Sequence, residues 1–165
     1  MDKLIDDLIK LAFAEDIGDG DHTTLCCIPE TAMGKSQLII KEDGVLAGVE
    51  MAKRIFHDFD PELKMTVFIQ DGAEVKKGDI AFVVEGKIQS LLQTERLMLN
   101  VMQRMSGIAT TTRKYAKALE GTKTHVLDTR KTTPGMRMID SGDTFHRFPQ
   151  KTLNFHCRIS PERIG

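Results

Sequence analysis

The first element that the hydrophobic pattern predicts is a helix at the start of the chain. Across residues 2–14, apolar side chains recur every three or four positions and charged side chains fill the opposite face. The apolar face consists of Leu4, Ile5, Leu8, Ile9 and Ala12. Gly18 and Gly20 follow among small polar residues, which is the composition of a turn. The pattern therefore predicts an amphipathic helix that ends in a loop.

Short strands around a second helix are predicted for the next part of the chain. The strand candidates are residues 36–41, 45–47, 63–70 and 80–85. The third of these alternates, with Leu63, Met65, Val67 and Ile69 on one side. Between them a helix is expected at about residues 49–59. That helix would bury Ala52, Ile55, Phe56 and Phe59. Strands packed with helices indicate the α+β class.

A long helix is expected from about residue 91 to residue 119. Ser90 and Gln93 have the spacing of a capping box, and apolar residues then recur near the helical period. Its three methionines, Met98, Met102 and Met105, are interpreted as core filling. Residues 124–128 resemble a short buried strand. In residues 139–165 apolar positions follow neither the helical nor the strand period. The pattern therefore predicts no helix or strand there and leaves open whether this tail is ordered.

The composition is that of an ordinary globular protein, with 41% hydrophobic and 28% charged residues. The net charge of -1 argues against a long-range field that would recruit nucleic acid or an anionic membrane. The first residues carry acids rather than a basic signal-peptide region, and no apolar run approaches a membrane span, so a cytoplasmic location is expected. Cys26, Cys27 and Cys157 form no metal or disulfide spacing and are interpreted as small buried hydrophobic residues.

Cationic side chains in two segments are the candidates for binding chemistry. Arg130 and Lys131 follow the predicted strand at its carboxyl end, where α/β folds bind ligands, and an arginine fork beside a lysine suits a polyanion. A solvated basic turn is the alternative for this pair. The other segment is the long helix, which carries Arg96, Arg104 and Arg113. For Arg104 and Arg113 a snorkelling surface position is the favoured interpretation.

The acidic segment at residues 15–24, EDIGDGDHTT, has two interpretations. A metal-binding loop is one, but the alternating oxygen ligands and distant glutamate of an EF-hand are not found. A turn that ends the first helix, stabilised by hydrogen bonds to aspartate side chains, is favoured.

Four segments taken together resemble the signatures of the quinolinate phosphoribosyltransferase family, over about residues 4–138. They are EDIGDGDHTT, KEDGVLAG, ERLMLNVMQRMSGIATTT and LDTRKTTPGMR, in this order. Each segment alone is weak, whereas the joint match is highly specific. The resemblance implies an enzyme of NAD synthesis that makes nicotinate mononucleotide from quinolinate and phosphoribosyl pyrophosphate with Mg²⁺, releasing pyrophosphate and carbon dioxide.

The resemblance also implies an architecture and a set of site residues. The fold implied is an N-terminal α/β sandwich at residues 1–108, followed by the start of an incomplete α/β barrel at 109–138 and a divergent tail at 139–165. The implied substrate-binding residues are Arg96, Thr129, Arg130 and Lys131. No catalytic residue and no metal ligand is assigned. A homodimer is implied, in which Arg96 reaches the site of the partner.

Beyond residue 138 the chain departs from the family pattern. The family's Asn-His-Arg segment, its later lysine, its acidic metal-holding residues and its glycine-rich phosphate loops do not occur here. His146 and Arg147 follow Phe145 and are not taken as equivalents. We therefore expect the chain alone to lack turnover, and carbon dioxide release from quinolinate tests this. The alternatives are a non-catalytic partner subunit that lends Arg96, or a biotinyl- or lipoyl-like carrier based on residues 71–86, although its lysine-bearing hairpin is missing.

Overall fold

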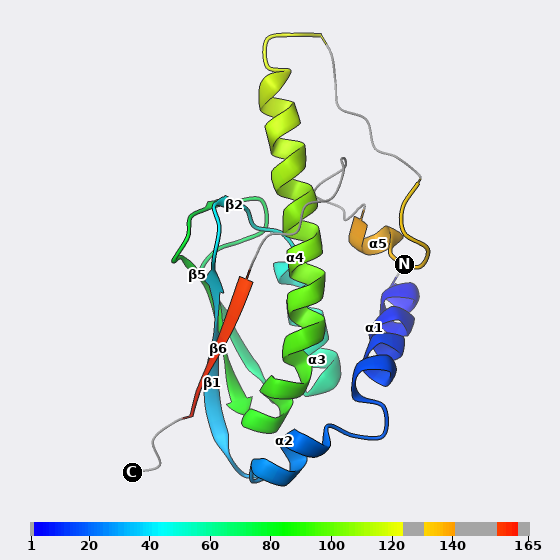
Figure 1. Ribbon diagram of the computed structural model, residues 1–165, viewed down its shortest axis with the longest axis vertical. Helices are drawn as coiled ribbons and strands as arrows, with labels where there is room; N and C mark the ends of the chain where they lie inside the picture. Colours follow the sequence, from blue (N-terminus) through cyan, green and yellow to red (C-terminus); the bar gives the residue numbers. More distant parts are fainter. Residues whose placement is uncertain (1, 124–130, 141–154, 162–165) are drawn as a thin grey trace.

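The computed structural model describes residues 2–123, 131–140 and 155–161 of the chain (Figure 1). The predicted strand at 124–128 lies outside these residues. The elements in chain order are α1 (Asp2–Ile17), α2 (His22–Cys27), β1 (Met33–Ile40), β2 (Gly44–Val45), α3 (Val49–Phe59), β3 (Lys64–Val67), β4 (Glu74–Val75), β5 (Ile80–Lys87), α4 (Ile88–Ala118), α5 (Arg137–Asp140) and β6 (Phe155–Pro161). The α+β class is confirmed.

An antiparallel sheet with the strand order β3-β5-β1-β6 forms one side of the molecule (Figure 1). Burial alternates along β1, where Leu38 and Ile40 are fully buried, and Phe82 and Val84 of β5 lie beside them in the core. β1, β3 and β5 correspond to predicted strands. The edge strand β6 lies in the tail for which the pattern predicts no element, because its pairing with β1 is a long-range contact that leaves no local period.

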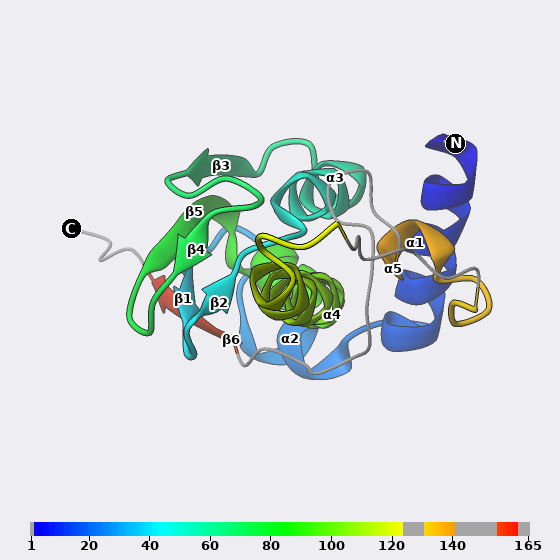
Figure 2. The same cartoon turned by 90° about the horizontal axis from the view of Figure 1, so that it is seen from above.

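Helices α3 and α4 cover one face of the sheet, and α1 lies on the far side of α4 (Figure 2). The core between sheet and helices includes Ile55 and Phe56 of α3 and Met98 and Met102 of α4, all nearly inaccessible to solvent. The ring of Phe56 meets the ring of Phe82 edge to face, with centroids 6.3 Å apart. The predicted helix at 49–59 and the core role of the methionines are therefore confirmed.

The start of α4 differs from the prediction. The helix begins at Ile88, directly after β5, and its N-cap residue Lys87 makes no side-chain capping bond. Ser90, expected to cap the helix, lies inside it and donates a hydrogen bond to Asp60 Oδ2 at 2.6 Å. The capping box was a wrong interpretation, because a strand that runs straight into a helix leaves no loop residue to act as a cap.

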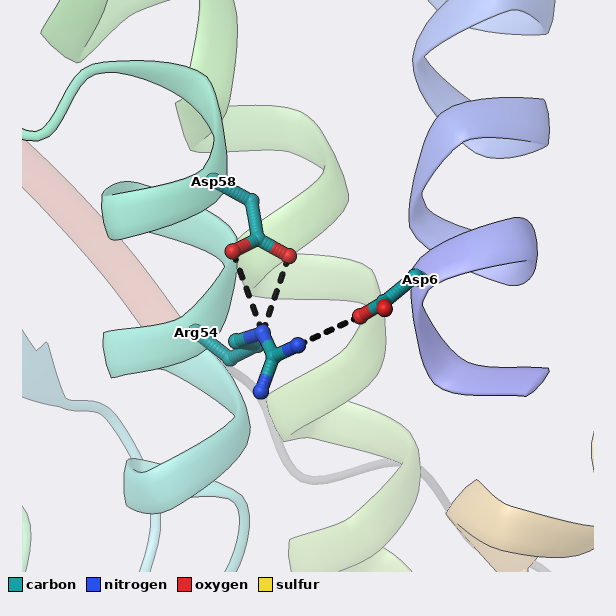
Figure 3. A network of polar contacts seen from close by, with 3 residues as sticks. All are labelled: Asp6, Arg54 and Asp58. Carbon is teal, nitrogen blue, oxygen red and sulfur yellow. Dashed lines mark hydrogen bonds and ion pairs between the residues drawn. The ribbon is translucent and has the colours of Figure 1, made fainter. Parts of the chain in front are cut away.

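The outer helix α1 is held partly by packing and partly by charge. Ile9 is buried against the core, whereas Leu4, which was expected on the same face, is 66% exposed. The helical period identifies the apolar face but not how far along the helix its neighbours extend. Arg54 of α3 adds a polar link, because its guanidinium contacts Asp6 of α1 and Asp58 of its own helix (Figure 3). The hydrogen bonds to Asp58 are the main reason that the pKa of Arg54 is raised.

Helix α2 forms where only a turn was expected. Asp21 caps it by accepting hydrogen bonds from the backbone N–H and the hydroxyl of Thr24, at 3.1 and 2.5 Å. Thr24 is the only buried residue of this six-residue helix. Cys26 and Cys27 are exposed free thiols, so their predicted burial was wrong. Only one side chain of this short helix is buried, and its other residues lie at the surface.

Hydroxyl groups of α4 hold the chain at β2. Ser106 and Thr110 lie one helical turn apart. The Ser106 hydroxyl accepts a hydrogen bond from the backbone N–H of Ala47, and the Thr110 hydroxyl accepts one from the backbone N–H of Val45, each at 2.9 Å. The Ser106 hydroxyl also donates to the carbonyl oxygen of Ala47 at 2.9 Å. Gly48 follows with a φ of 100°, and a Cβ there would lie 3.3 Å from Met102 Cα. The chain and α4 therefore approach closely at this point.

Candidate functional site

A groove of about 520 Å³ opens where α1, α3, α4 and α5 meet. Apolar side chains make up most of its wall. The polar lining residues are Glu15, Asp16, Arg96, Asn100, Gln103 and Arg104. Four of them, from Arg96 to Arg104, come from one side of α4 because they are spaced by about one or two turns. The groove thus combines apolar surface with charges of both signs, and its arginines are both paired with aspartates, Arg96 with Asp16 and Arg104 with Asp140.

Arg96 is the predicted site residue that faces this groove. Its side chain is 72% exposed, and one guanidinium nitrogen lies 2.5 Å from Asp16 Oδ1 at the end of α1. The acidic segment 15–24 therefore meets α4 through an ion pair. A carboxylate of the chain itself therefore occupies one guanidinium nitrogen of Arg96, while most of the side chain stays exposed.

Arg104 is not the snorkelling surface residue that was expected. Its side chain is only 24% exposed and forms a fork with Asp140, through contacts of 2.5 Å and 3.0 Å. The terminal guanidinium nitrogen that binds Asp140 also donates a hydrogen bond to the hydroxyl of Thr133 at 2.7 Å. Hydrogen bonding to Asp140 raises the pKa of Arg104, while its partial burial opposes the shift. The reason for the error is that Asp140 lies far along the chain, in a part without a recognisable pattern.

The segment after Lys131 is a tight turn that leads into α5. Thr133 and Met136 are joined by a backbone hydrogen bond of 2.9 Å, with Pro134 and Gly135 between them and a φ of 78° at Gly135. These are the residues that a type II turn prefers at its two central positions. Lys131 is exposed and is not among the residues that line the groove. Thr129 and Arg130, also predicted to bind substrate, lie outside the described residues.

The other end of α4 carries a separate group of charges. Arg113 and Lys117 both contact Glu74 of β4, at 3.9 and 2.9 Å. The hydrogen bond from Lys117 is the main cause of the lowered pKa of Glu74. Arg113 is therefore a surface residue with an acidic partner, as expected, and it serves below as a matched control for the arginines of the groove.

In the acidic segment a turn does follow α1, as favoured, but the aspartate hydrogen bonds belong to the N-cap of α2. The hydrogen bonds from Thr24 lower the pKa of Asp21. Among residues 2–123, 131–140 and 155–161, no cluster of three histidine, cysteine, aspartate or glutamate side chains could bind a metal ion. Over the same residues, no helix combines the length and the apolar character needed to cross a bilayer.

The segments described above match known proteins. The family models named "Quinolinate phosphoribosyl transferase, N-terminal domain" and "C-terminal domain" match residues 21–106 and 108–143. "Quinolinate phosphoribosyltransferase [decarboxylating] 1" of Nicotiana glauca is 46% identical over 134 residues, and "2b, mitochondrial" of Nicotiana tabacum is 42% identical over 135. Each match covers 81% of this chain and 38% of the relative.

A solved structure has the same fold. The crystal structure of NadC from Streptococcus pyogenes superposes with a TM-score of 0.80 at 38% sequence identity, covering 84% of this chain and 50% of that one. The chain thus spans half or less of the length of these proteins.

Proposed function

The chain belongs to the quinolinate phosphoribosyltransferase family, and on this basis we propose that it takes part in the transfer of a phosphoribosyl group to quinolinate. The full reaction joins quinolinate and phosphoribosyl pyrophosphate, releases pyrophosphate and carbon dioxide, and leaves nicotinate mononucleotide. We assign substrate binding to Arg96, Thr129, Arg130 and Lys131.

The observation that carries this proposal is the contact between Arg96 and a carboxylate at the groove. Asp16 holds the guanidinium at 2.5 Å while most of the arginine side chain stays exposed. A substrate carboxylate can therefore approach the remaining donors without displacing a buried structure. The apolar wall of the groove offers a surface for a pyridine ring.

The proposed chemistry asks for positioning and charge rather than for a covalent intermediate. Quinolinate carries two carboxylates, and its partner carries a phosphate and a pyrophosphate, so convergent cations lower the cost of bringing them together. Transfer passes through a cationic state at the sugar carbon. Once the ring nitrogen has bonded to the sugar carbon and pyrophosphate has left, the positive charge on the nitrogen stabilises the carbanion that loss of carbon dioxide leaves on the adjacent ring carbon. A proton then adds to that carbon and completes nicotinate mononucleotide.

Three finer parts of the proposal concern the metal, the partner and the location. Mg²⁺ would accompany phosphoribosyl pyrophosphate. The described residues offer no metal-binding cluster, so no residue is assigned to the ion and no step depends on it. We propose a homodimer in which Arg96 serves the site of the second subunit, and a cytoplasmic location. We also propose a division into a sandwich at residues 1–108 and the start of a barrel at 109–138, and the change of family model between residues 106 and 108 supports this boundary.

Calorimetric titration of the purified 165-residue chain with quinolinate tests the binding role. We expect Arg96→Gln to weaken binding by about tenfold or more, the loss typical of one charge-assisted hydrogen bond. Nicotinate, which has a single carboxylate, should bind more weakly than quinolinate. Arg113→Gln is the matched control, because it removes an arginine from the same helix that pairs with Glu74 instead.

Equal affinity of the wild type and Arg96→Gln would contradict the proposal. Carbon dioxide release from quinolinate in the presence of phosphoribosyl pyrophosphate and Mg²⁺ measures turnover separately, and the expectation that this chain alone shows none stays a prediction. Of the alternatives, the carrier module is not favoured, because the family matches include residues 71–86. Co-elution with a full-length relative would support the partner-subunit role.

A further inference from the structure

We propose that Arg104, Thr133 and Asp140 form a clamp that positions Lys131 for the anionic substrate. The inference rests on the proposed function and goes beyond it, because none of these three residues is assigned to substrate binding. Arg104 and Asp140 are positioning residues in this proposal: they act through Lys131 and touch no substrate.

The clamp joins α4 to the chain on both sides of the turn at Pro134 and Gly135. Arg104 Nε and one terminal nitrogen bind the two oxygens of Asp140, and the same terminal nitrogen reaches the Thr133 hydroxyl. The backbone N–H of Thr133 donates to Asp140 Oδ2 at 3.1 Å, which closes the ring of contacts. The side chain of Asp140 is only 8% exposed, so water screens this network less than it screens the exposed ion pairs of the molecule.

Packing holds the far end of the clamped segment. Ile139, next to Asp140, is buried in the main core, and Met136 packs against that core. The N–H groups of Ile139 and Asp140 donate to the carbonyl of Met136 at 2.9 and 2.8 Å. A four-residue helix such as α5 is not stable by itself, so its position depends on these contacts and on Arg104.

The consequence for Lys131 follows from the reach of the chain. Only Thr132 separates Lys131 from Thr133, so two steps along the chain join them, and two steps span at most about 7 Å. With Thr133 fixed on Arg104 of α4, the backbone of Lys131 is confined to a small region near that contact. Without the clamp, the segment from Lys131 to Thr133 loses this contact with α4, and the entropy of ordering Lys131 is added to the cost of binding.

A double-mutant cycle on the full chain separates positioning from a direct charge effect. Quinolinate affinity is measured by calorimetry for the wild type, Arg104→Met, Lys131→Met and the double variant. Amide hydrogen exchange over residues 133–140 is followed in each. We expect each single change to weaken quinolinate binding by about tenfold, and the double variant to bind no more weakly than Lys131→Met. Exchange at residues 133–140 should rise in Arg104→Met and stay unchanged in Lys131→Met.

Two further variants complete the design. Arg104→Lys keeps the charge but lacks the fork, so it should lose exchange protection and affinity nearly as Arg104→Met does. Arg113→Met, on the same helix, should alter neither. Additive losses of affinity in the double variant, or unchanged exchange in Arg104→Met, would overturn the clamp while leaving the proposed function intact. A wild-type chain that binds no quinolinate would refute the proposed function and, with it, the role of the clamp in binding.

Discussion

Replacement of Ser106 by alanine is expected to destabilise the protein far more than the loss of one oxygen atom suggests. The Ser106 hydroxyl is fully buried and serves both polar groups of the Ala47 backbone, accepting from its N–H and donating to its carbonyl. Ala47 itself is buried, so after the substitution both groups lose this partner in a place that water reaches poorly.

The magnitude follows from the two groups. An unsatisfied buried backbone group costs about 1–3 kcal/mol, and the better helix propensity of alanine returns only about half a kcal/mol. The free energy of unfolding should therefore fall by about 2–5 kcal/mol, a large share of the roughly 5–15 kcal/mol that holds a typical domain together. For a chain of this size that corresponds to a melting temperature lower by about 5–20 °C.

Thr94→Val is the matched control for this experiment. Thr94 is also a fully buried hydroxyl residue of α4, but it donates to carbonyls of its own helix, those of Ser90 and Leu91. Those carbonyls lie inside the helix and keep its backbone hydrogen bonds, so a loss of about 1 kcal/mol or less is expected. Urea unfolding followed by circular dichroism measures both variants. Equal losses for Ser106→Ala and Thr94→Val would refute the reasoning, because they would show that the bridge to Ala47 adds nothing.

Three other predictions concern separate parts of the fold. Gly48→Ala should destabilise the chain more than Gly78→Ala by about 1–2 kcal/mol in urea unfolding, because both glycines have a φ near 100° but only Gly48 faces another backbone atom within 4 Å. Asp21→Asn keeps a cap but removes a carboxyl whose pKa is lowered from 3.8 in the folded state. Above the pKa that Asp21 has in the unfolded chain, the ionised carboxyl stabilises the fold. This stabilisation is lost as the pH falls through the lower pKa that Asp21 has in the folded protein. Thermal melts between about pH 2 and pH 5 should therefore show a shallower acid loss in Asp21→Asn than in the wild type, and identical slopes would contradict this. Phe82→Ala should cost about 3–5 kcal/mol and Phe68→Ala less than about 1 kcal/mol, because the first ring is buried against Phe56 and the second is exposed.

Sequence patterns predicted most of the sandwich because its elements have strong periods. The helix at 49–59 has the bounds expected for it, and the inward residues of β3 follow the predicted alternation. Elements that depend on distant partners were not found. β4 is only two residues long and exists through its pairing with β2, and β6 exists through its pairing with β1. Neither leaves a local pattern to recognise.

The candidate site was predicted in part, and the missing part has a physical reason. Arg96 was identified through a family resemblance, whereas the periodic pattern alone marked it only as a cation on a helix. Arg104 was interpreted as a surface residue, because a sequence does not show that Asp140, 36 residues later, returns to it. Whether an arginine has a structural role depends on the groups that accept its hydrogen bonds. For Arg104 the tertiary fold supplies these groups.

Helix α4 touches each of the other three segments that carry the family resemblance. It meets the acidic segment through Arg96 and Asp16, the KEDGVLAG segment through Ser106 and Ala47, and the segment before α5 through Arg104 and Thr133. Arg96 and Arg104 are eight residues apart, about 12 Å along the helix axis. Contacts at that distance change the free energy of unfolding independently, whereas the two residues of one contact do not. Substitutions in this protein can therefore be combined freely between the Arg96 contact and the Arg104 contact. Ser106 lies only two residues from Arg104, so changes at these two positions are not expected to add independently.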